Sequence, residues 1–153
     1  MTRYLDILTI LSAGLLIGTE FAVSVFINPV LWRLEDQAQA FAIKAFASKL
    51  GKVMPFWYVG TLLLLVAEAI LRRSQPGEAL VIGSCAVWTA VIVLTLLFLV
   101  PINNRIASVG DVVLSDAVKQ EHKLWDARHR LRVVALTVAM VLFLSAVVGG
   151  NPA

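Results

Sequence analysis

The sequence predicts an all-α fold, a transmembrane antiparallel four-helix bundle. Hydrophobic residues make up 59% of the 153 residues, charged residues only 15%, and the mean hydropathy is +0.87. So few charges cannot cover the surface of a soluble protein of this size, and the excess apolar surface must face lipid. The charges also fall between four apolar runs, each near the roughly 20 residues that cross a bilayer. We therefore expect one integral membrane domain over residues 1–153.

The first apolar run, residues 4–32, predicts a retained transmembrane helix. Its start resembles a signal peptide, but the apolar stretch continues too far and lacks a small-residue cleavage site. Glu20 is the charge in its middle. Pro29, after Asn28, is expected to release or kink the last turn, because proline has no backbone N–H to donate.

Residues 33–52 form loop 1 and predict a separate amphipathic helix lying at the membrane interface. Glu35 and Asp36 occupy its first turn, where the helix dipole favours acids, and three lysines lie towards its end. An apolar face of leucine, phenylalanine and alanine suits the interface. We expect Gly51 to end this helix.

The second span covers residues 54–72 and opens at Met54-Pro55. Glu68 lies four residues before Arg72, which favours an ion pair at the outer interface over a functional site.

The third span, residues 79–101, contains no charged residue and is expected to end at Pro101. Loop 3 covers residues 102–130 and is expected to be partly helical from about Asp111. The fourth span, residues 131–149, closes at Gly149-Gly150. Short connections between the spans predict antiparallel neighbours.

The basic residues predict the orientation in the cell (inner) membrane. Ten of the thirteen lie in or beside loops 1 and 3: Arg33, Lys44, Lys49, Lys52, Arg105, Lys119, Lys123, Arg128, Arg130 and Arg132. The other three are Arg3, Arg72 and Arg73. The positive-inside rule therefore places both loops in the cytoplasm and both termini outside. Because these basic residues flank apolar runs, the pI near 9.4 indicates lipid headgroups rather than nucleic acid as the partner.

Two polar stripes converge at the predicted cytoplasmic end. Glu20, Ser24 and Asn28 are four residues apart on the first helix. A second stripe comprises His122, Trp125, His129 and Arg132. Together they predict a pocket open to the cytoplasmic leaflet, with aromatic walls from Phe21, Trp32, Trp57 and Trp125.

Each polar residue has a plainer alternative. Glu20 is either a functional acid or a buried structural partner, since a charged acid facing lipid is costly. Asn103 and Asn104 either cap backbone groups freed by Pro101 or contact a substrate. His122 is expected to be solvated. His129 is the better base, because Asp126 lies within one turn and could orient its ring.

The metal signal is weak. The sequence lacks a Glu-x-x-His motif, Glu20 and Glu68 lie at different membrane depths, and no histidine lies deep in a span. We predict no cofactor and no metal site. A haem or a metal ion is the alternative, with His122, His129 and Glu20 as ligands. Cys85 is the single cysteine, which excludes a disulfide within the chain.

Four short motifs carry a resemblance to a known family: Asn28-Pro29, Met54-Pro55, Pro101-Ile102-Asn103-Asn104, and Trp125 followed by His129-Arg130 and Arg132. In this order and spacing the chain resembles the anthrone oxygenase-like family of small four-helix membrane proteins, from about Leu11 to Val147. The resemblance implies oxidation of an apolar aromatic, anthrone-like small molecule by O2 without an added cofactor.

If this chemistry applies, His129 is the base and Asp126 orients it. Asn103 and Asn104 are then oxyanion donors, and Arg132 stabilises charge. The expected substrate-binding residues are Glu20, Asn28, Trp32 and Trp125, with Trp125 as a platform for the rings.

Two other functions stay open. A small proton-coupled transporter or lipid-binding protein would use Glu20 as its proton site. An accessory subunit would dock a cytoplasmic partner through loops 1 and 3. Whether the chain forms a homo-oligomer is also open.

Overall fold

The computed structural model describes residues 2–108 and 116–149, and within these ranges the chain is helical apart from short turns. The elements in order are α1 (Thr2–Ala22), the π-helical turn η1 (Val23–Ile27), α2 (Asn28–Leu31), α3 (Asp36–Leu71), α4 (Glu78–Leu94), the π-helical turn η2 (Thr95–Leu99), α5 (Val100–Ser108) and α6 (Asp116–Gly149).

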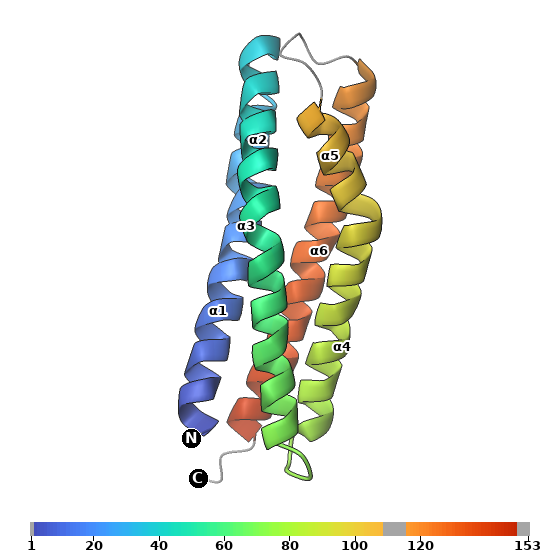
Figure 1. Ribbon diagram of the computed structural model, residues 1–153. Coiled ribbons are helices and arrows are strands. Elements are labelled where there is room, and N and C mark those ends of the chain that lie inside the picture. The colour runs from blue at the N-terminus through green and yellow to red at the C-terminus, as the bar shows by residue number, and fades with distance from the viewer. Residues whose placement is uncertain (1, 109–115, 150–153) are drawn as a thin grey trace.

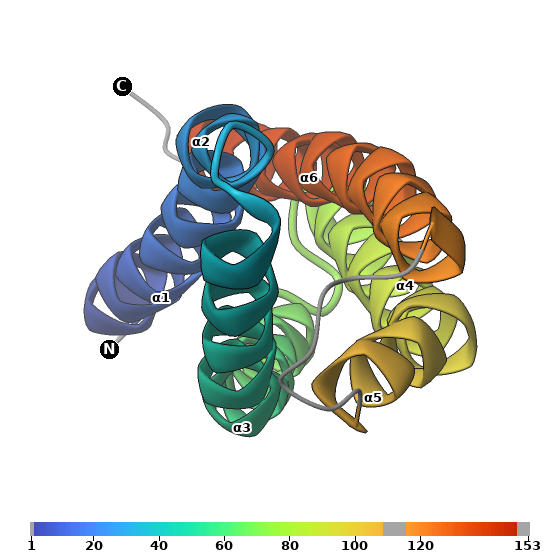
Figure 2. The same cartoon turned by 90° about the horizontal axis from the view of Figure 1, so that it is seen from above.

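These elements form four long rods. The first is α1–η1–α2, the second α3, the third α4–η2–α5 and the fourth α6, and they run up and down side by side (Figure 1). Seen from above, α3 lies between α1 and α4, and α6 contacts both α4 and α1 (Figure 2). The predicted antiparallel four-helix bundle is confirmed. Below, the α5 end is the end of the bundle that contains α2, α5 and the start of α6.

The rods are long and apolar enough to cross a membrane. Four candidate spans cover Arg3–Leu31, Asp36–Leu71, Glu78–Ile106 and Lys119–Gly149. Large apolar side chains lie both inside and outside: Leu16, Trp88 and Phe143 are fully buried, whereas Phe56 and Leu63 are exposed. An apolar outer surface of this extent fits lipid, so the chain has the architecture of a multi-pass membrane protein.

Neither Pro29 nor Pro101 ends its helix. Pro29 and Pro101 each lie two residues after a π-helical turn, and both rods continue through them. Proline clashes with the carbonyl four residues earlier, which belongs here to Val25 or Leu97, inside η1 or η2. The wider turn, closed by bonds from Asn28 N–H to the Val23 carbonyl and from Val100 N–H to the Thr95 carbonyl, accommodates the ring. The prediction that Pro101 ends the third span was therefore wrong.

The interfacial helix of loop 1 is not separate. It is the first half of α3, which passes through Gly51 and Pro55 without a break. Glycine inside a helix costs only about 1 kcal/mol relative to alanine, too little to end a helix that packs on its neighbours. Here the missing side chain has a use, because a Cβ on Gly51 would lie 3.1 Å from Asn103 Nδ2. The small residue lets α5 approach α3 closely.

Loop 3 is also more helical than predicted. α5 carries the third rod to Ser108, and α6 begins at Asp116, well before the expected start of the fourth span. The inner face of α6 is one buried stripe that runs through His122, Asp126, His129, Val133 and Leu136 without a change of period. This continuous stripe explains why no loop separates the two parts. The expected helix start near Asp111 and the end at Gly150 lie outside the described residues.

At the opposite end of the bundle, the predicted pair of Glu68 and Arg72 is confirmed. Arg72 Nε donates to Glu68 Oε2 over 3.1 Å, and Arg72 also pairs with Asp6 of α1. All three side chains are buried, so the cluster ties α1 to α3 inside the bundle rather than lying at an exposed interface.

Candidate active site

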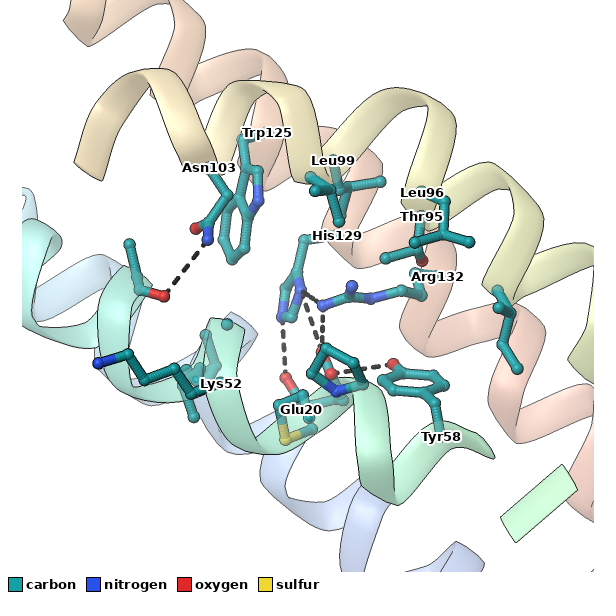
Figure 3. Close-up of a pocket in the computed structure, with 18 of the residues that line it drawn as sticks. Glu20, Lys52, Tyr58, Thr95, Leu96, Leu99, Asn103, Trp125, His129 and Arg132 are labelled. Atoms are coloured by element: carbon teal, nitrogen blue, oxygen red, sulfur yellow. Dashed lines mark hydrogen bonds and ion pairs between the residues drawn. The ribbon is translucent and has the colours of Figure 1, made fainter. Parts of the chain in front are cut away.

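The α5 half of the bundle contains a cavity of about 480 Å³, lined by all four rods. Figure 3 shows part of its wall. The wall is mostly apolar, with Val23, Met54, Ile92, Leu96 and Leu99 among its residues. Its polar groups include a compact cluster of Glu20, Tyr58, His129 and Arg132, joined by dashed lines in Figure 3. A cavity of this size falls within the 300–1,000 Å³ typical of small-molecule sites.

Glu20 is the centre of the cluster. Its side chain is buried, and both carboxylate oxygens have partners: Tyr58 Oη donates to Oε1 over 2.9 Å, and Arg132 Nη2 donates to Oε2 over 2.5 Å. The acid therefore has a counter-ion inside the bundle, which offsets part of the desolvation cost of a charge at this position. The backbone carbonyl of Tyr58 accepts a hydrogen bond from Trp88 Nε1 over 3.1 Å, which joins α3 to α4 beside the cluster.

The contacts of His129 define its tautomer. Nε2 lies 3.0 Å from the backbone carbonyl of Glu20, which can only accept, so Nε2 carries the hydrogen. Nδ1 lies 2.7 Å from Arg132 Nη2, which can only donate, so Nδ1 carries a lone pair. The ring is therefore the neutral Nε2–H form. Nδ1 also lies 3.2 Å from Glu20 Oε2.

An aromatic stack continues from His129 towards the α5 end. Trp125 lies parallel to His129, with ring centroids 4.7 Å apart and an interplanar angle of 11°. His122, also on α6, stacks on Trp125 with ring centroids 5.9 Å apart. Trp32, which directly follows α2, packs against His122 with ring centroids 4.8 Å apart. His122 is buried in this stack, so the prediction that it is solvated was wrong. Its polar neighbours in sequence hid the fact that position 122 lies on the inner stripe of α6.

Asp126 lies in a different contact from the one expected. It accepts a hydrogen bond from Asn28 Nδ2 over 2.7 Å and pairs with Arg130. His129 instead contacts Glu20, Arg132 and Trp125, so Glu20 holds the ring that Asp126 was expected to hold. Asn28 and Asp126 join α2 to α6 beside the cavity rather than lining it.

The two asparagines of α5 do line the cavity. Asn103 Nδ2 donates to the carbonyl of Ala47 over 3.3 Å, which links α5 to α3. This bond uses one of the two amide hydrogens, and the other is available to a ligand. Because α5 continues beyond Pro101, neither asparagine caps a helix end at that proline.

The predicted aromatic walls are mostly elsewhere. Only Trp125 lines the cavity, while Trp32 borders a separate surface pocket with Lys123 and Arg130. Trp57 donates to Ser12 Oγ over 3.2 Å, and Phe21 packs on Phe26 with 48% of its surface exposed. Conversely, Tyr58 and Lys52 also line the cavity and were not predicted, because they lie on α3 without a polar stripe to mark them.

The metal alternative can be compared with the geometry. Among residues 2–108 and 116–149, no three His, Cys, Asp or Glu side chains come together in a way that could hold a metal ion. Of the ligands considered, His122 and His129 stack on the same indole, Trp125, which lies between them on α6.

Comparison with known families gives one clear result. A family model described as anthrone oxygenase matches residues 43–142, which include Tyr58, Asn103, Asn104, Trp125, His129 and Arg132. Comparisons with curated proteins and with solved structures gave no significant match. The matched region covers most of the chain and supports an oxygenase-like function at the family level. By this match the chain belongs to the anthrone oxygenase family.

Proposed function

We propose that this protein oxidises an apolar, anthrone-like aromatic substrate with O2 in the cavity around Glu20 and His129. The observation that carries the proposal is the combination of a large apolar cavity with one compact acid–base cluster on its wall. An extended aromatic ring system suits the apolar walls, and its reacting carbon would lie near the cluster. Membership of the family supports the reaction class.

The chemistry needs a base and a stabilised oxyanion. An anthrone carries a CH2 group between two aryl rings, conjugated to a carbonyl, so a side-chain base can remove one proton. The resulting carbanion, drawn as an enolate, reacts with O2 to form a C–O bond and a hydroperoxide. Loss of water from the hydroperoxide leaves a second carbonyl. The net change converts CH2 and O2 to C=O and H2O.

His129 is the proposed base, acting through Nδ1. Its Nε2–H is held by the Glu20 carbonyl, so the lone pair on Nδ1 is the one that can accept the substrate proton. Once protonated, Nδ1 would donate to Glu20 Oε2, which already lies 3.2 Å away. Glu20 thus takes the stabilising role that the sequence assigned to Asp126.

Arg132 is the proposed stabiliser of the enolate. In the resting site its Nη2 bridges His129 Nδ1 and Glu20 Oε2. Binding of the substrate oxygen would draw the guanidinium away from Nδ1 and free the base. Asn103 and Asn104 supply further donors on the cavity wall, and Trp125 serves as the ring platform. Asp126, Asn28 and Trp32 act indirectly, by holding α2 and α6 in register.

The reaction is tested by oxygen uptake and quinone formation with anthrone and purified protein in detergent. Anthrone oxidises slowly in solution, so the rate without protein is subtracted. We expect wild-type protein to give stoichiometric anthraquinone, and Glu20→Gln to lower the rate by about 10²-fold or more. Phe21→Leu is the control, since Phe21 directly follows Glu20 in sequence but its side chain does not line the cavity. Wild-type rates equal to the background would overturn the proposal.

The transporter alternative predicts a different outcome for the same variant. It requires Glu20 to load and release a proton, whereas its carboxylate is engaged by Arg132 and Tyr58. Proton-driven uptake that is lost in Glu20→Gln, together with no anthrone-dependent oxygen uptake in the wild type, would favour the transporter.

The site is proposed to face the cytoplasmic leaflet of the cell membrane. The support is the distribution of Lys and Arg, ten of which lie at the α5 end or in the adjoining segments, against three at the other end.

A further inference from the structure

A second, smaller cavity of about 50 Å³ lies beside the main one. Ile27, Leu31, Ile43 and Ile106 line this small cavity and not the main one, so they form its own wall. Leu31, Ile43 and Ile106 are buried and pack as one apolar cluster with Ile27 at its edge. We call this small cavity the side chamber.

The side chamber shares a partition with the main cavity. Val23, Ala47, Leu50, Asn103 and Trp125 line both spaces. Trp125 is the ring that stacks on the proposed base His129. A molecule in the side chamber would therefore be separated from the reacting carbon only by the side chains of this partition.

Volume limits what the chamber can hold. Its 50 Å³ is far below the roughly 300 Å³ at which small-molecule sites begin, so no aromatic ring system fits. One water or one diatomic molecule does, since a water takes up about 30 Å³ in the liquid.

The chemistry of the wall favours the apolar occupant. An ordered buried water typically makes about three hydrogen bonds. Asn28 Nδ2 already donates to Asp126, and Asn103 Nδ2 to the Ala47 carbonyl. His122 Nδ1 is the one buried atom of this wall found without a partner among the described residues. Asn28, Asn103 and His122 are the polar residues of this wall, and its other nine residues are apolar. This mostly apolar wall favours O2 over an ordered water, because apolar cavities stay dry and take up gases such as xenon.

We propose that the side chamber is the dioxygen subsite of the enzyme. This inference rests on the proposed oxygenase function. O2 would enter the side chamber from the lipid or the main cavity, dwell against Ile43 and Ile106, and reach the carbanion past Trp125. The chamber thereby raises the local concentration of O2 next to the substrate without competing for the space that the aromatic rings occupy.

The test fills the chamber without touching the main cavity. In Ile43→Phe the larger ring occupies the chamber, and we expect the KM for O2 to rise about tenfold, with the KM for anthrone and the rate at saturating O2 little changed. Ile82→Phe makes the same substitution on the exposed face of α4 and is the matched control. Ile106→Ala enlarges the chamber and should lower the KM for O2, which keeps the test informative if the phenylalanine variant does not fold.

Xenon binding tests the side chamber without an activity assay. Crystals of the wild-type protein under xenon pressure should show xenon in the side chamber, and crystals of Ile43→Phe should not. A wild-type protein with no anthrone-dependent oxygen uptake would overturn the proposed function and, with it, the role of the chamber. Active wild-type protein whose KM for O2 is the same in Ile43→Phe and Ile106→Ala, or an ordered water in place of xenon, would overturn the subsite alone.

Discussion

Arg132 and Glu20 join α6 to α1 inside the bundle, with Nη2 and Oε2 2.5 Å apart although 112 positions separate the two residues. The same nitrogen also lies 2.7 Å from His129 Nδ1. One guanidinium group thus neutralises a buried acid and covers the lone pair of the proposed base. The pairing makes Arg132 important for stability as well as for the proposed reaction.

Removing one partner of this pair should destabilise the fold. Arg132→Gln leaves Glu20 buried without a counter-ion, and we expect a loss of about 3 kcal/mol or more in the free energy of unfolding. Glu20→Gln with Arg132→Gln should recover part of this loss, because no charge is then left unpaired. Unfolding of the two single variants and the double variant in detergent measures the coupling. Losses that simply add up would show that the two residues do not depend on each other.

The close approach of α3 and α5 predicts opposite effects for two glycines of the same helix. Gly60→Ala meets nothing within 4 Å and should stabilise the protein by up to about 1 kcal/mol through helix propensity. Gly51→Ala should lack this gain and be destabilising, because its Cβ would lie 3.1 Å from Asn103 Nδ2 and disturb the bond to Ala47. Thermal unfolding of both variants is the measurement. Equal stabilisation by the two substitutions would contradict the packing described.

The buried cluster at the other end predicts a difference between two adjacent arginines. Arg72→Met leaves Asp6 and Glu68 facing each other without a counter-ion, so we expect a loss of about 3–5 kcal/mol. Arg73 is exposed, and Arg73→Met should change stability by no more than about 0.5 kcal/mol. The two melting curves are compared directly. Similar curves would mean that the cluster does not hold α1 to α3.

The orientation is a separate prediction. With Cys85→Ala as background, Ser74→Cys lies in the exposed turn before α4 and Ser108→Cys at the end of α5. A membrane-impermeant thiol reagent should label Ser74→Cys in right-side-out vesicles and Ser108→Cys in inside-out vesicles. The reverse pattern would place the α5 end outside the cell.

The number and class of the helices follow from sequence because hydropathy and length decide them locally. The stripe of His129 and Arg132 could also be predicted from the sequence, since residues three apart share a helix face. The helix ends could not be predicted in this way. Pro101 and Gly51 are good local signals for a helix end, but η2 accommodates the proline, and contact with Asn103 explains the glycine.

The rest of the site depends on which helices are neighbours. Tyr58 contacts Glu20, and Asp6 contacts Arg72, only because α1 and α3 pack side by side. The spacing of residues within one helix does not predict which helices are neighbours. The partner of His129 was misassigned for the same reason. Asp126 is close in sequence, but Asn28 and Arg130 engage it, while Glu20 reaches the ring from another helix.

The most direct test of the central claim is anthrone oxidation by His129→Ala. The proposal predicts that this protein folds and binds substrate but loses at least about 10² in the rate of anthrone-dependent oxygen uptake. Val134→Ala, on the exposed side of the same helix, should keep the wild-type rate. Full anthrone oxidation by His129→Ala would remove His129 as the base and contradict the mechanism.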